Sequence, residues 1–415
     1  MRVHRMQTWL RVRPRPTALA VLSTLVIACL AAPAAAQQPD TTTRTSLIEQ
    51  AQAEKAAVLQ PYKPTAAEKY LDYAEAYLTS GKLHWHPYFT SAYAGGGFTL
   101  GAGYLQHVGS YNVLNLRGSL TFSGYKRVEA AFTAPRAFGK QIGLSFLGGW
   151  REATQVGFYG IGTSTEKDSR ANYGFQQPYG SAAIDLSPAF RVLVLRGGFE
   201  ASQWEQGPGS GSAPSVETVY TPATLPGLGA KPTYLHSQGT VGIDWRPSPG
   251  YARRGGFYGV TFHDFADPDK AYGFTQMDYE AIQHIPVLRE AWVLSFHGLV
   301  ETSSPKSNEQ VPFFMLPSVG GGSELRGFST WRFRDRNSLL LQAEWRIMVN
   351  RFIDTAVFVD GGKVTAHRSD LNLDALKTDG GFGIRFHGPL ATPLRIDVAK
   401  GNEGIVLVFS ATGVF

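Results

Sequence analysis

The segment SLLLQAEWRI, residues 338–347, alternates between two kinds of side chain. Every odd position is apolar, whereas Gln342, Glu344 and Arg346 occupy even positions. Because successive side chains of a β-strand point to opposite faces, the pattern predicts a strand with one apolar and one charged face. Such alternation fits both a soluble β protein and an outer-membrane β-barrel. The same division recurs in three other segments, residues 292–301, 382–387 and 394–398.

The number and connection of such segments favour the barrel. Counting them along the chain predicts sixteen strands, and bacterial single-chain barrels have an even number. Short connections such as Ser187-Pro188 alternate with long ones at residues 152–171, 204–232 and 303–336. This is expected when short turns face one side of a membrane and long loops the other. The sequence therefore predicts an all-β fold, a 16-stranded antiparallel transmembrane β-barrel.

The first strand is predicted at residues 86–93, followed by a second at 97–106. The glycines at 95–97 leave an alternative open, because they fit a bulge within one longer strand equally well. That alternative would give an odd number of strands.

The N-terminal residues have the composition of a targeting segment. Five arginines precede an apolar run at residues 17–32, and three alanines follow at 34–36. This predicts a signal peptide over residues 1–36, with a lipoprotein cleavage site before Cys29 as the alternative. Without those arginines the 39 basic residues fall to 34 against 33 acidic ones. The basic pI then disappears, and we expect no binding of nucleic acid.

Residues 37–84 have the sequence pattern of helices, unlike the strand pattern of the residues that follow. Ser46 with Glu49, and Thr65 with Glu68, have the spacing of capping boxes that start two helices. We predict a periplasmic helical segment over residues 37–84, packed against the barrel rim or plugging the lumen. The barrel is then expected over residues 85–415.

Two further stretches are singled out in the predicted barrel. Residues 206–231 are rich in Gly, Pro and Ser and are predicted to form a flexible surface loop. The last strand places Ile405, Leu407, Phe409 and Phe415 on one predicted lipid-facing side. An aromatic final residue on such a stripe resembles the C-terminal signal for barrel assembly, so Phe409 and Phe415 are predicted to form that signal.

The long connection at residues 303–336 carries a glycine-rich stretch followed by Arg326. Loops of this length are usually functional or disordered. Glu344 and Asp360, on the next two predicted strands, both fall on the inward face. If the loop folds back into the lumen, the planar guanidinium can pair with these acids and act as a latch.

The order of these motifs resembles the BamA/TamA outer-membrane superfamily, also called the bacterial surface antigen family. The matching stretches are a Gly-Gly-x-x-x-Leu-Arg-Gly-Phe loop, Glu-Trp-Arg on the next strand and Phe-x-Asp-x-Gly on the one after. The turn at residues 244–247 and the loop at 158–162 resemble features of the same family. The resemblance implies a lumen-docked latch whose positions here are Arg326, Gly327, Phe328, Glu344, Phe358, Asp360 and Gly362.

The resemblance also implies a function. It implies help with inserting or translocating outer-membrane proteins or lipids, without enzymatic chemistry and without a cofactor. The expected partners are outer-membrane lipids and lipopolysaccharide, with client outer-membrane proteins or the barrel-assembly machinery as further candidates. The segment before the barrel is shorter than one POTRA domain of the family and reads as helical, so the resemblance does not extend to docking with partner lipoproteins. A passive or gated pore and a surface adhesin or receptor are the alternative functions.

Two groups of residues have the chemistry of metal ligands. His84 and His86 are spaced for a strand-borne site, and Asp264, Asp267 and Asp269 could hold calcium in an outer loop. The first pair lacks a third ligand, and the acids equally fit a solvated turn. We expect no metal site.

Overall fold

The computed structural model describes residues 44–58, 65–66, 68–70, 84–288, 290–410, 413 and 415. The predicted signal peptide lies outside these residues. Residues from Glu75 onward form one compact unit, and the described helices before it belong to another. No helix of the described ranges is both long and apolar enough to cross a bilayer.

In the N-terminal unit, α2 spans Arg44–Val58. The helix therefore begins two residues before Ser46, so the predicted cap at that residue is wrong. The second predicted cap is confirmed, because Thr65 N donates to Glu68 Oε2 (2.7 Å) and Glu68 N donates to Thr65 Oγ1 (3.3 Å). These reciprocal bonds are those of a capping box.

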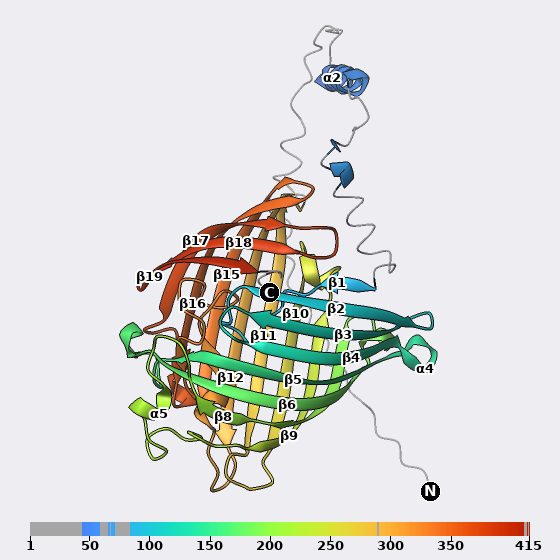
Figure 1. Ribbon diagram of the computed structural model, residues 1–415. Coiled ribbons are helices and arrows are strands. Elements are labelled where there is room, and N and C mark those ends of the chain that lie inside the picture. The colour runs from blue at the N-terminus through green and yellow to red at the C-terminus, as the bar shows by residue number, and fades with distance from the viewer. Residues whose placement is uncertain are drawn as a thin grey trace, which may run out of the picture. The chain divides into compact units, whose positions relative to one another are not determined.

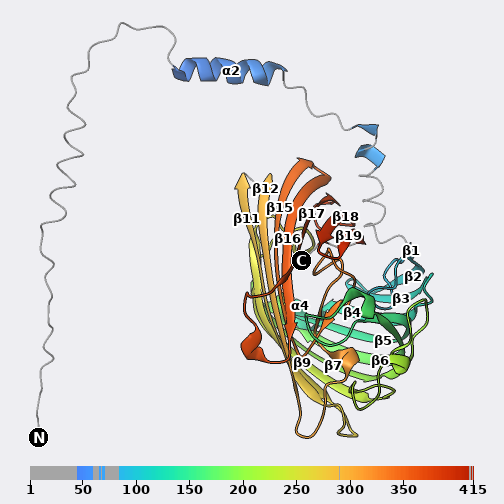
Figure 2. The same ribbon diagram turned by 90° about the vertical axis from the view of Figure 1, so that its left-hand side faces the viewer.

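The barrel wall is one antiparallel sheet, each strand pairing with its neighbour in the chain (Figures 1 and 2). In the described residues the sheet has seventeen strands, but they occupy sixteen positions around the wall. The short strand β8 (Glu205–Pro208) pairs with β6 in continuation of β7, so β7 and β8 share one position. The strands of the wall are β1 (Trp85–Pro87), β2 (Thr99–Val108), β3 (Asn112–Thr121), β4 (Lys126–Arg136), β5 (Ile142–Phe158), β6 (Ala171–Asp185), β7 (Leu193–Gln203), β9 (Thr233–Asp244), β10 (Gly255–Ala266), β11 (Phe274–Leu288), β12 (Trp292–Pro305), β15 (Asn337–Asn350), β16 (Ile353–Thr365), β17 (Lys377–Phe386), β18 (Leu394–Gly401) and β19 (Gly404–Ser410).

Short elements lie in the connections. They are α4 (Ala137–Lys140), η1 (Lys167–Ser169), η2 (Ser187–Ala189), α5 (Val216–Val219), η3 (Pro249–Tyr251), η4 (Phe313–Met315), β13 (Ser318–Val319), β14 (Phe333–Arg334) and η5 (Arg368–Asp370). The first predicted strand is shorter than expected, because regular pairing with β2 covers only residues 85–87. The following residues, including the three glycines, form an irregular stretch with bends and one turn.

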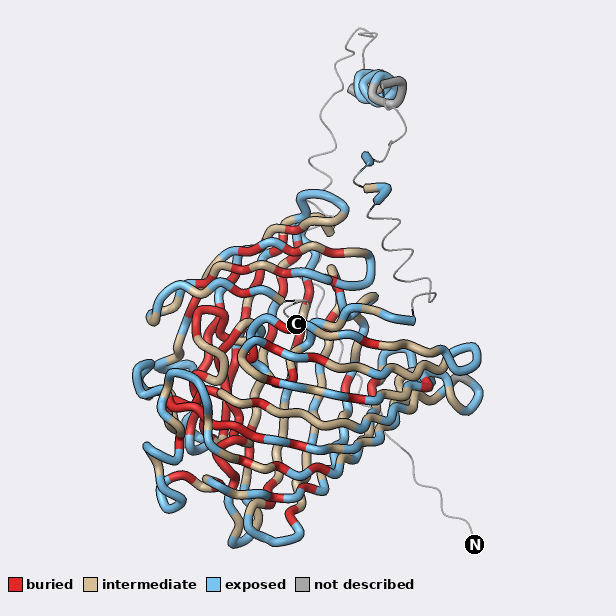
Figure 3. Tube along the Cα trace, in the orientation of Figure 1, coloured by how far each residue is buried: buried red, intermediate tan, exposed pale blue. Residues whose placement is uncertain are grey.

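The wall buries its charged side chains and exposes its apolar ones, the reverse of a soluble protein. Along β15, Gln342 and Glu344 are 3% and 4% exposed, whereas Leu341 and Trp345 are 36% and 39% exposed. Stretches of β15, β16, β17 and β18 alternate between buried and more exposed residues, and Figure 3 shows buried, half-buried and exposed residues mixed along the strands. This arrangement suits a wall surrounded by lipid with a polar interior, and it confirms the predicted barrel.

At the end of the barrel that carries the long loops, the connections pack into an aromatic core. Residues 206–231, predicted to be flexible, contribute Val216 and Leu225, which are 0% and 1% exposed. Phe313 N donates to Pro226 O (2.9 Å), joining this loop to the next long one. The prediction that residues 206–231 are flexible is therefore wrong, because the few apolar residues of this loop pack against aromatic side chains. The core's large aromatic members include Tyr125, Phe158, Tyr173, Phe175, Trp204, Tyr234, Phe274, Phe313 and Phe314.

Candidate functional site: the docked loop between β12 and β15

The loop that joins β12 to β15 turns sharply at two glycines. Gly320 and Gly321 have φ values of +133° and +112°, which disfavour any other residue. At Gly320 a Cβ atom would also lie 2.6 Å from Ser329 O. The turn carries the chain onto the inner face of β15 and β16, where Leu325 is fully buried.

Arg326 is held by two acids of the wall. Its Nε lies 2.7 Å from Asp360 Oδ2 and its Nη2 lies 2.7 Å from Asp360 Oδ1, while Nη1 donates to Glu344 Oε2 (2.9 Å). The guanidinium lies 3.4 Å from the ring centre of Phe358. Burial alone would lower the pKa of Arg326, but the bonds and charges of Asp360 and Glu344 outweigh it and raise that pKa. The sequence-predicted partners thus lie together.

The glycines and Phe328 of the motif make the close approach possible. A Cβ atom at Gly327 would lie 2.6 Å from Asp379 Cβ and 2.7 Å from Gly401 N, so the loop touches β17 and β18. At Gly362 a Cβ atom would meet Leu339 O at 2.9 Å. Phe328 is buried and packs on Phe333, with ring centres 5.4 Å apart.

Further charges extend the site beyond the predicted residues. Arg385 Nη2 lies 2.6 Å from Glu344 Oε2, and the same guanidinium pairs with Asp397. Asp397 Oδ2 lies 3.2 Å from Arg395 Nη1, and Arg395 Nη2 donates to Gly322 O (2.6 Å). A series of alternating charges therefore starts in the loop, crosses β16, β15, β17 and β18, and returns to the loop. For Arg385, Arg395 and Asp397, the only signal in the sequence was their position on the inward face of the predicted strands.

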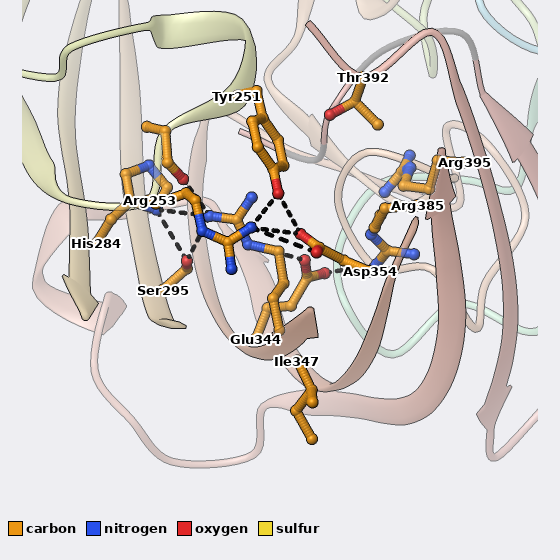
Figure 4. A network of polar contacts seen from close by, with 12 residues as sticks. Tyr251, Arg253, His284, Ser295, Glu344, Ile347, Asp354, Arg385, Thr392 and Arg395 are labelled. Carbon is orange, nitrogen blue, oxygen red and sulfur yellow. Dashed lines mark hydrogen bonds and ion pairs between the residues drawn. The ribbon is translucent and has the colours of Figure 1, made fainter. Parts of the chain in front are cut away.

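A second polar network lies at the opposite, short-turn end (Figure 4). Tyr251, in the turn between β9 and β10, donates to Asp354 Oδ2 of β16 (2.8 Å) and stacks on His387, with ring centres 3.9 Å apart. Arg253 Nη1 lies 3.2 Å from Asp354 Oδ2, and His387 Nε2 lies 3.2 Å from Oδ1. Arg346 reaches this turn by donating to Ala252 O. We name residues 245–254 the mouth strap, because they bond to strands far away in the sheet.

The predicted C-terminal signal divides between the two faces of the wall. Phe409 is 65% exposed on the outer face, together with Ile405 and Leu407. Phe415 instead stacks on His284 and His297, with ring centres 5.9 and 5.2 Å apart. These histidines are buried inward-facing residues of β11 and β12. The predicted outward position of Phe415 is therefore wrong, because its ring packs against two histidines that point into the barrel.

The candidate metal ligands have other partners. Asp267 accepts hydrogen bonds from the backbone N–H groups of Asp269, Ala271 and Tyr272 at 2.9–3.1 Å, and Asp264 pairs with Lys306. His84 Nδ1 lies 2.9 Å from Leu105 O. In the part of the chain that the structure describes, no three His, Cys, Asp or Glu residues are grouped to hold a metal ion.

The outward apolar wall, the charged interior and the docked loop define a transmembrane β-barrel of the bacterial outer membrane. Residues 108–405 match the Omp85 superfamily domain, so the chain belongs to the Omp85 superfamily, as the motifs predicted. No curated protein sequence matches it.

Solved structures of similar fold agree with this assignment. BamA from Haemophilus ducreyi lacking POTRA domains 1-3 is 16% identical, with a TM-score of 0.59, over 78% of this chain and 68% of that one. CdiB from Escherichia coli is 12% identical, with a TM-score of 0.50, over 76% of this chain and 57% of that one. The chain thus spans little more than half the length of CdiB. At these identities the likeness concerns the fold.

Proposed function

We propose that this Omp85 barrel assists the insertion or translocation of outer-membrane proteins or lipids, without enzymatic chemistry. The observation that carries the proposal is the loop docked by Arg326. The loop pairs with the inner wall through Glu344 and Asp360 and also touches β18 through Gly327. A change in the docking of this loop would therefore alter its contacts with the last hairpin of the wall, β18–β19. Strand edges freed there would offer unpaired backbone groups to another strand.

The docked loop and the mouth strap favour this proposal over a passive pore. Arg326 and Asp354, which anchor them, are both 0% exposed, so both ends of the C-terminal half of the barrel carry chain in the interior. A passive pore of this width requires an open lumen. The adhesin alternative rested on the long outer loops, and in the loop at residues 206–231 the apolar side chains Val216 and Leu225 are turned into the aromatic core.

The proposed orientation places the N-terminus and the short turns in the periplasm and the long loops outside. The proposed partners are unfolded client barrel proteins, the barrel-assembly machinery, and membrane lipids including lipopolysaccharide. The signal peptide at 1–36, the helical segment at 37–84 and the assembly role of Phe409 and Phe415 remain predictions alongside this proposal.

The test measures the folding rate of an unrelated denatured barrel protein into liposomes that contain this protein. Empty liposomes and liposomes with Arg326→Ala serve as comparisons. We expect acceleration by the natural protein and its loss in the variant. Folded protein that gives no acceleration would overturn the proposal, and single-channel conductance would then be recorded.

A further inference from the structure

The docked loop makes a second set of contacts, beyond the Arg326 site. Its residues Thr330 and Trp331 face the chain that precedes β2. Trp331 Nε1 donates to Ala94 O (3.0 Å), and its ring stacks on Tyr93 with centres 4.8 Å apart. Thr330 lies 3.7 Å from the position of a Cβ atom on Gly95. This part of the loop therefore contacts the N-terminal half of the barrel.

Arg332 follows directly and joins two other parts of the chain. Its Nη1 donates to Thr165 Oγ1 (2.8 Å) and its Nη2 donates to Thr165 O (2.6 Å), in the loop after β5. Its Nε lies 2.9 and 3.0 Å from the two carboxylate oxygens of Glu403. Glu403 belongs to the turn between β18 and β19. One guanidinium thus connects the fifth strand's loop with the last hairpin of the wall.

Arg332 is buried and packed between aromatic rings. Arg332 is 1% exposed, and its guanidinium lies 4.8 Å from the ring centre of Tyr159 and 4.4 Å from that of Phe333. Lys167 Nζ adds a bond to Glu403 O (2.9 Å) from the same loop as Thr165. A buried Arg with both a carboxylate and rings around it is held in one geometry.

The backbone at Trp331 is adapted to this arrangement. Trp331 has φ +61°, a left-handed conformation that a bulky residue rarely adopts. Such a conformation persists only where the surroundings hold it, and here the stacking on Tyr93 and the bond to Ala94 do so. The turn directs Trp331 to one side and Arg332 to the other.

We propose that Arg332 and Glu403 form a clasp that holds the β18–β19 hairpin to the N-terminal half of the barrel, separately from the Arg326 latch. The two arginines of one loop have different main partners. Arg326 pairs with Glu344 of β15 and Asp360 of β16, and at 3.8 Å with Asp397 inside the barrel on β18. Arg332 instead reaches the turn between β18 and β19 and the loop after β5. In this arrangement the clasp controls the position of the last strand at the long-loop end. Loss of the clasp frees that hairpin while Arg326 stays docked.

The clasp goes beyond the proposed function, because it concerns the position of a hairpin whatever the barrel transports. The test is therefore a distance measurement. Spin labels are placed on cysteines at Glu166 and Asn402, two exposed positions beside the clasp, in a Cys29→Ser background. Their distance distribution is recorded by pulsed electron paramagnetic resonance in the refolded barrel. The variants are Arg332→Ala and the milder Glu403→Gln, with Arg368→Ala, on another long loop, as the matched control.

We expect one short, narrow distance in the natural protein and in Arg368→Ala. In Arg332→Ala we expect the short distance to disappear and longer distances to replace it. In Glu403→Gln we expect the fraction of molecules with the short distance to decrease. Arg326→Ala should shift the short-distance population less than Arg332→Ala does, because the clasp stays in place. An unchanged distribution in folded Arg332→Ala would overturn the clasp. Equal loss in Arg326→Ala would overturn its independence from the latch. Neither result depends on whether the barrel accelerates the folding of a client.

Discussion

The guanidinium of Arg326 and the carboxylate of Asp360 form a two-point ion pair, with both N–O distances at 2.7 Å. The third donor direction is taken by Glu344 at 2.9 Å. A lysine could not reproduce this geometry, because its ammonium is a single point of charge. The loop is thus held by directed hydrogen bonds of the planar guanidinium as well as by the attraction between opposite charges.

Arg326→Ala is expected to destabilise the barrel. It leaves two buried carboxylates without one of their cations, a change that typically costs about 3–5 kcal/mol, with the lower end expected if water enters the lumen. Denaturant unfolding, followed by gel mobility of the folded barrel, measures the loss. Arg368→Ala is the control and should change little. Equal stability of the two variants would show that the latch contributes nothing.

Gly327→Ala is expected to lift the loop from the wall. The new Cβ atom would lie 2.7 Å from Gly401 N, a backbone atom that cannot move aside easily. Overpacking of this kind costs about 1–3 kcal/mol. Limited proteolysis should cut the loop faster in this variant. Gly207→Ala, where the added atom meets nothing within 4 Å, should be cut at the natural rate.

Asp354→Asn is expected to loosen the mouth strap. The carboxylate of Asp354 accepts from Tyr251, Arg253 and His387, and its loss leaves Arg253 without a counter-charge. Ionic conductance in planar bilayers should rise relative to the natural protein. Glu290→Gln is the control, because Glu290 is an exposed partner of Arg254 in the neighbouring turn. A folded Asp354→Asn variant with unchanged conductance would contradict a closing role for the strap.

Docking of the loop is expected to weaken as the pH rises. Burial, with the nearby charge of Glu301, raises the pKa of Glu324 from 4.5 to about 8. A raised carboxyl pKa means that the folded state holds its proton more tightly, so this stabilisation is complete below pH 4.5 and lost as the pH rises toward 8. Hydrogen exchange of residues 320–334 should therefore show less protection at pH 9 than at pH 6, after correction for intrinsic rates. In Glu324→Gln that difference should diminish, and an unchanged difference would rule this residue out.

Much of the fold could be predicted from local patterns. Period-two alternation identifies which face of β15 carries Glu344, because it depends only on strand geometry. The same parity puts Asp360 inward, and the glycines before Arg326 indicate a loop able to fold back. The pairing of these three residues could therefore be anticipated from their positions along the chain.

What lies across the barrel could not be predicted in this way. The contact of Arg332 with Thr165 and Glu403, the reach of Tyr251 to Asp354, and the inward turn of Phe415 join residues that no periodicity relates. Such contacts depend on how the curved wall brings distant loops over one lumen. Local strand geometry and spacing are enough to predict the strands, their two faces and the positions of Arg326, Glu344 and Asp360. Which loops fill the barrel, and which charges they meet, follows instead from packing between segments distant in the chain, so it is visible only in the folded protein.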